Sequence, residues 1–97
     1  MSLSLAELEE LVMKFQPIIR YTIGEDDQHI LFHLENDKEI AIRITENGGG
    51  FEALGQLRDK NERGFGGSNS FFTGDTELDV VENILNKVLE HDQKRQT

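Results

Sequence analysis

The stretch QHILFHLENDKEIAIRIT, residues 28–45, decides the fold of this chain. Its large apolar side chains fall at every second position, at Ile30, Phe32, Leu34, Ile40, Ile42 and Ile44. Because successive side chains of a β-strand point to opposite faces, this alternation predicts two strands, each with one buried and one wet face. The polar residues between the two apolar runs predict that the strands are joined as a hairpin.

Residues 18–23 predict a further strand, and the turn-forming residues 24–27 connect it to the hairpin. Matching the apolar faces gives the expected registers. Ile23 lies opposite Ile30, and Ile19 opposite Leu34. Leu34 lies opposite Ile40, so residues 36–38 form the second loop and Glu35 faces Glu39. A slip of one residue would turn an apolar face to water, so the pattern specifies which side chains point inward.

A helix is expected on each side of this meander. Residues 4–15 carry leucine, valine and phenylalanine at helical spacing, and Ser4 with Glu7 fits a capping box at the start. Residues 76–91 form a second helix with Thr76 as N-cap. Its apolar stripe is broad enough that a dimer interface is an alternative to complete burial within one chain.

The segment 46–74 has a different composition. Eight of the nine glycines lie between Gly48 and Gly74, and no regular period is sustained. We expect an irregular segment here, with a short helix around residues 51–57 and an edge strand at residues 70–73. Long loops without regular structure are uncommon in small domains and often carry function.

The composition restricts the classes of function. The 97 residues suit a single domain, residues 1–97, and 36% hydrophobic with 30% charged residues is typical of a globular protein. The net charge of −9 argues against binding nucleic acid or anionic membranes, since both require cationic surfaces. Cysteine is absent, and no apolar run approaches the length of a membrane span or signal peptide. The cytoplasm is therefore the expected location.

Candidate catalytic or metal-binding residues are not indicated by the spacing. His29 and His33 would chelate a metal on a helix, but four residues of strand hold them roughly 13 Å apart. The carboxylates of residues 25–27 lack the spacing of a calcium loop. No serine lies in a nucleophile elbow. We therefore expect neither catalytic residues nor metal nor cofactor sites, and we expect that the protein is not an enzyme.

One locally cationic, aromatic stretch interrupts the acidic chain at residues 58–72. The residues expected to contact a partner or ligand there are Arg58, Lys60, Arg63, Phe65 and Phe71. Loops that combine basic and aromatic side chains are frequent contact surfaces. The alternative is that the phenylalanines fold onto the core and the charges are only solvated.

These patterns predict an α+β fold. It is a two-layer sandwich in which a three- to four-stranded antiparallel meander carries the N- and C-terminal helices on one face, in the order α-β-β-β-(β)-α. The expected function is that of a small acidic, non-enzymatic protein-interaction module, such as a bacterial or phage regulator, inhibitor or chaperone-like accessory factor. A protein partner is expected, with a second copy of the chain among the candidates. The alternative function is ligand or nucleic-acid binding by the basic, glycine-rich loop 58–72.

Overall fold

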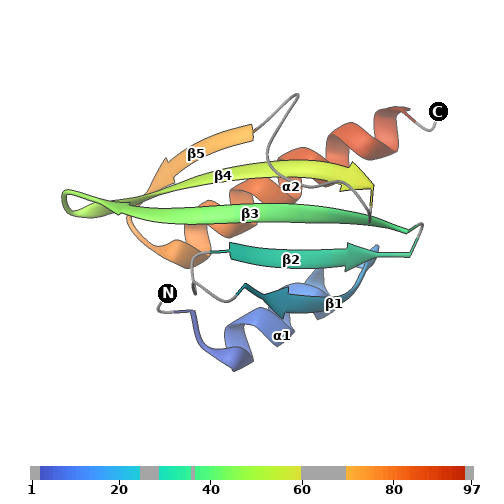
Figure 1. The fold of residues 1–97 in the computed structure, drawn as a ribbon, viewed down its shortest axis with the longest axis horizontal. Helices are drawn as coiled ribbons and strands as arrows, with labels where there is room; N and C mark the ends of the chain where they lie inside the picture. The colour runs from blue at the N-terminus through green and yellow to red at the C-terminus, as the bar shows by residue number, and fades with distance from the viewer. Residues whose placement is uncertain (1–2, 25–28, 36, 60–69, 96–97) are drawn as a thin grey trace.

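The computed structural model describes residues 3–24, 29–35, 37–59 and 70–95, which form a five-stranded sheet and two helices (Figure 1). In chain order the elements are α1 (Leu5–Lys14), β1 (Ile18–Ile23), β2 (His29–Leu34), β3 (Lys38–Asn47), β4 (Gly50–Asp59), β5 (Ser70–Gly74) and α2 (Glu77–Arg95). The strands are antiparallel and lie in the order of the sequence, β1 to β5. The predicted α+β fold is confirmed, with more strands than the sequence indicated.

Both helices cover the same face of the sheet. Figure 1 looks onto the opposite face, with the strands in front of α2. The apolar residues of both helices join those of the strands in one core cluster, whose fully buried members include Leu8, Ile30, Phe32, Ile42 and Ile84. The alternation of residues 28–45 thus has the predicted consequence: one face of the sheet is dry because it meets the helices.

The start of α1 is fixed by the predicted capping box. The side chain of Ser4 accepts a hydrogen bond from the backbone N–H of Glu7, and Glu7 Oε1 accepts one from the backbone N–H of Ser4. These contacts satisfy donors that the first helical turn leaves unpaired. Leu8 and Leu11 then anchor the helix in the core.

The C-terminal helix buries its apolar stripe within the chain. Thr76 caps it by accepting a hydrogen bond from the backbone N–H of Asp79 at 3.1 Å. Val80, Val81, Ile84 and Leu85 are fully buried. Val88 and Leu89 are each only 6% exposed. The sheet covers these side chains, so this part of the stripe that suggested a dimer interface is buried within the chain.

The glycine-rich segment contains the main departure from the sequence-based expectation. Residues 50–59 form the long strand β4, which pairs with β3 over its whole length, so the predicted short helix at residues 51–57 is wrong. A tight turn at Gly48 and Gly49 makes this pairing possible. Their φ angles are +54° and +107°, values that glycine adopts without steric cost. The edge strand predicted at residues 70–73 is confirmed as β5.

Two of the predicted registers are wrong in detail. Ile18, rather than Ile19, lies opposite Leu34, because β1 contains a register shift between Ile18 and Arg20. Ile18 is consequently buried, whereas Ile19 is 54% exposed. The hairpin of β2 and β3 is also displaced.

In that hairpin Phe32 lies opposite Ile40 and His33 opposite Glu39, a shift of two residues from the prediction. A shift of two keeps each side chain on its predicted face. The expected pairing of Glu35 with Glu39 is therefore replaced by a pairing of His33 with Glu39.

Among the described helices, neither is long and apolar enough to cross a membrane.

Candidate functional site

The face of the sheet that points away from both helices carries the polar side chains of the strands, and we call it the outer face. Its residues are Arg20, Thr22, His29, Leu31, His33, Glu39, Ala41, Arg43, Thr45, Glu52, Leu54, Gln56, Arg58, Phe71 and Thr73. The antiparallel registers place these side chains in rows that cross the strands, so that residues distant in sequence become neighbours.

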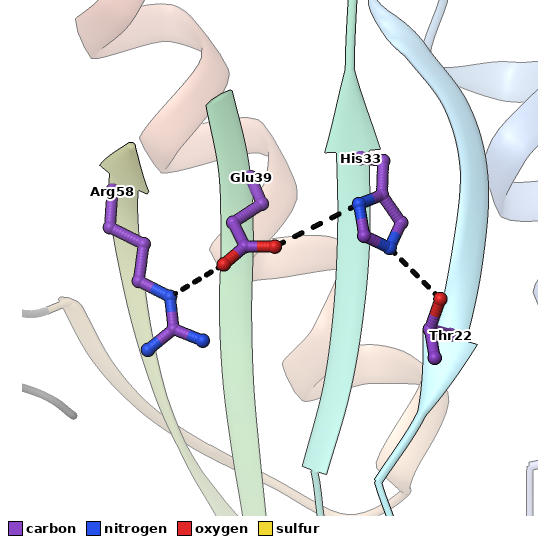
Figure 2. A network of polar contacts seen from close by, with 4 residues as sticks. All are labelled: Thr22, His33, Glu39 and Arg58. Carbon is purple, nitrogen blue, oxygen red and sulfur yellow. Dashed lines mark hydrogen bonds and ion pairs between the residues drawn. The ribbon is translucent and has the colours of Figure 1, made fainter. Parts of the chain in front are cut away.

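One row forms a continuous polar network (Figure 2). His33 lies opposite Glu39, and Glu39 lies opposite Arg58. Arg58 Nε donates a hydrogen bond to Glu39 Oε1 at 2.9 Å, and His33 Nδ1 lies 3.8 Å from Glu39 Oε2. Thr22 Oγ1 and His33 Nε2, 2.9 Å apart, share a hydrogen bond. The network thus joins β1, β2, β3 and β4.

Glu39 is the centre of this network and is nearly dry. Its side chain is 5% exposed, and the side chains of His33 and Arg58 are each 13% exposed. A buried carboxylate is tolerated only where hydrogen bonds and an opposite charge replace its hydration. Arg58 supplies both in a charge-assisted contact. The network therefore holds β3 and β4 in register on the side away from the core.

The order of hydroxyl, imidazole and carboxylate in Thr22, His33 and Glu39 is that of a hydrolytic triad. Two features argue against that chemistry. The distance of 3.8 Å between His33 and Glu39 exceeds that of a hydrogen bond. A tetrahedral intermediate also needs N–H donors that converge on one oxygen, whereas successive N–H groups of a strand point in opposite directions. The arrangement around Thr22 favours a structural network.

A buried acceptor lies in the next row of the outer face. Gln56 lies opposite Ala41, and it is only 6% exposed. Its side-chain oxygen, Oε1, has no hydrogen-bond donor among the described residues. A buried acceptor of this kind costs free energy until a donor reaches it. Among the described residues, the side-chain oxygen of Gln56 is therefore a buried hydrogen-bond acceptor of the outer face that has no donor.

A third row combines charge with apolar surface. Arg43 lies opposite Leu54, which in turn lies opposite Phe71 at the edge strand β5. Arg43 is exposed and Leu54 is half-buried. Phe71 is 58% exposed, which is unusual for a phenylalanine on an ordered strand. This row gives the outer face an accessible aromatic group and a cation, with Leu54 between them.

The sequence-predicted contact residues are distributed differently from the expectation. Arg58 lies on β4, not in a loop, and it is engaged with Glu39. Phe71 lies on β5 and is exposed, as a contact residue would be. Lys60, Arg63 and Phe65 lie outside the described residues. The structure thus brings Arg58 and Phe71 onto one face, from two different strands.

Sequence reasoning missed the most organised part of this face. The alternation of residues 28–45 predicts that Glu39 and His33 point away from the core, but it does not predict their pairing, which depends on the register of the second hairpin. The sequence pattern gives no indication of Gln56 as an outer-face residue, because it does not indicate the strand β4 that carries it.

In the described parts of the chain, no group of three or more His, Asp or Glu residues is arranged to hold a metal ion.

Comparison of the chain with protein-family models, with curated proteins and with solved structures found no match.

Proposed function

We propose that this protein is a small non-enzymatic interaction module that binds another protein through the outer face of its sheet. The observation that carries the proposal is the third row of that face. Phe71, more than half exposed, lies beside Leu54 and in one row with the exposed Arg43. Aromatic and arginine side chains are enriched at protein–protein interfaces relative to the rest of the surface.

The layer arrangement supports the same assignment. The two described helices lie on the other face and pack most of their apolar residues there, so that neither of them covers the outer face. The polar network of Thr22, His33, Glu39 and Arg58 fixes side chains on this face. Contact residues on a sheet held this way lose little conformational freedom on binding, which favours affinity.

A binding role without catalysis agrees with the chemistry of the network. Arg58 and Glu39 neutralise one another, and His33 is held between Glu39 and Thr22. Groups fixed in mutual contacts are poor general acids and bases unless a substrate displaces a partner. We assign the protein to the cytoplasm, as a regulator, inhibitor or accessory factor. A second copy of the chain as partner would have to use a surface other than the stripe of α2.

The experiment is a quantitative capture from a lysate of the source cells, with matched variants of the purified protein. Phe71→Ser removes the exposed aromatic group of the outer face, and Met13→Ser removes an exposed apolar group of α1, which is 83% exposed. We expect Met13→Ser to retain the proteins that the parent captures and Phe71→Ser to lose them. Equal capture by both variants, or loss with Met13→Ser alone, would refute the assignment of the outer face.

A further inference from the structure

We infer that the outer face receives an acidic, extended segment of its partner, held by Arg20 and Arg43. This inference rests on the proposed function and adds the chemistry of the partner. Its basis is the way in which charge is divided between the two faces of the molecule.

The outer face is cationic although the chain is strongly acidic. The net charge of the protein is −9. All three arginines of the described strands, Arg20, Arg43 and Arg58, lie on the outer face, whose only acidic residues are Glu39 and Glu52. The two helices on the opposite side carry eight acidic and four basic residues. Negative charge is thus concentrated away from the proposed contact surface.

Among the described residues of the outer face, Arg20 and Arg43 are the exposed arginines that a partner would meet. Arg58 is 13% exposed and donates to the buried Glu39, so this pair contributes little net charge at the surface. Arg20 and Arg43 are both exposed. The planar guanidinium group binds carboxylates with two parallel hydrogen bonds and is less strongly hydrated than a lysine ammonium group. An acidic partner is therefore the complement of this face.

The spacing of the two arginines fits an extended chain. Arg20 lies on β1, in the same row as Glu39 of β3 and two strands away from it. Arg43 lies on β3, four residues after Glu39. With strands about 4.8 Å apart and about 3.3 Å per residue, their α-carbons are separated by about 16 Å. Two carboxylates four residues apart on one side of an extended peptide lie about 14 Å apart. Both come within reach of the long arginine side chains.

A second copy of this chain does not fit the same surface. Two outer faces brought together would place cationic surfaces against one another. Their carboxylates would offer little compensation, because Glu39 is already bonded to Arg58 and Glu52 to Asn47. Like charges placed opposite one another at an interface disfavour association. Packing the acidic helices of one copy on the outer face of another is a head-to-tail contact, which builds a ring or a filament and not a two-fold dimer. The outer face is therefore assigned to a different protein.

The test uses two synthetic peptides and the full chain labelled with 15N. One peptide repeats Asp-Ser-Leu-Ser, which places aspartate and leucine on the same side of an extended chain, and the other has lysine in place of aspartate. We expect the acidic peptide to shift the amide resonances of outer-face residues such as Leu31, Arg43, Leu54 and Phe71. The lysine peptide should leave them unchanged. Added salt should weaken the acidic complex, since exposed ion pairs are screened.

Variants then assign the effect to the two arginines. Arg20→Gln with Arg43→Gln should weaken binding of the acidic peptide at least about tenfold, which corresponds to about 1.4 kcal/mol of binding free energy. The matched control, Lys14→Gln with Lys87→Gln, removes two cations of the helices and should leave the affinity unchanged.

Three results would overturn the inference. They are stronger binding of the lysine peptide to the outer face, shifts confined to the helices, and concentration-dependent shifts of the outer face in the absence of peptide. The first leaves the proposed function intact, because the outer face would still bind a protein segment of opposite chemistry. The capture experiment with Phe71→Ser and Met13→Ser tests the proposed function separately.

Discussion

Arg58 of β4 donates a 2.9 Å hydrogen bond to Glu39 of β3 on the side of the sheet away from the core, where the Glu39 side chain is 5% exposed and that of Arg58 is 13% exposed. The contact joins two residues that lie directly opposite one another in the longest strand pair of the fold. It shows that the outer face is an organised surface, because a carboxylate is buried there only where it is matched.

Removing Arg58 should destabilise the protein strongly. Arg58→Ala leaves Glu39 buried without its charge partner, and the expected loss is about 3 kcal/mol of unfolding free energy. Urea denaturation measures it. Replacing both residues with leucine should recover most of the loss, because no charge then remains buried. The control is Lys14→Ala, whose ion pair with Glu82 is exposed and should contribute less than about 1 kcal/mol. Equal effects of Arg58→Ala and Lys14→Ala would contradict the burial of the Glu39 network.

Gly55 should tolerate no side chain, because β4 passes directly over Ile84 of α2. A Cβ atom at position 55 would overlap the Cγ2 atom of Ile84, which is fully buried. Gly55→Ala should therefore cost about 2 kcal/mol through overpacking. In the background of Ile84→Ala the same substitution should cost much less, since space has been opened. Thermal denaturation of the four proteins completes the double-mutant cycle, and strict additivity would contradict the contact.

The fold was predictable from sequence where apolar and polar residues alternate along the chain. It was not predictable where a contact with a distant residue determines which amino acid a position can hold. The pattern of residues 28–45 correctly gave the strands and their buried face. Gly55 and the glycines at 48–50 made β4 read as irregular, because glycine has low strand propensity. Its presence at 55 is explained by Ile84, a contact between residues far apart in sequence.

The candidate site was less predictable for a related reason. Alternation cannot distinguish registers that differ by two residues, since both keep the apolar face inward. The turn decides the register, and Asp37 adopts a φ of +61° there, a conformation tolerated by aspartate and asparagine. The pairing of His33 with Glu39 follows only once that register is known.

The turn between β3 and β4 should respond differently at its two glycines. At Gly48, with φ of +54°, asparagine is well tolerated, so Gly48→Asn should leave stability unchanged or raise it slightly. Gly49, with φ of +107°, lies outside the region accessible to branched residues, and Gly49→Val should cost about 2 kcal/mol. Thermal denaturation compares the two variants. A larger loss with Gly48→Asn than with Gly49→Val would show that the turn has another geometry.

Substitution of Gln56 should have opposite effects on the stability of the protein and on its binding of a partner. Because its buried Oε1 has no donor among the described residues, Gln56→Met should raise the unfolding free energy by about 1 kcal/mol. The control, Gln16→Met at an exposed position, should have no effect. If a partner supplies the missing donor, Gln56→Met should also weaken capture. A loss of stability on substitution would mean that the carbonyl has a donor in solution.

The central claim, that the outer face of the sheet is the binding surface, is tested most directly by photo-crosslinking in the source cells. A photoreactive phenylalanine analogue is placed at Phe71 or Thr45 on the outer face, or at Leu5 or Met13 on α1, and each of these side chains is exposed. We predict covalent adducts with the same partner from Phe71 and Thr45, and none from Leu5 or Met13. Adducts from the helix positions alone would contradict the account.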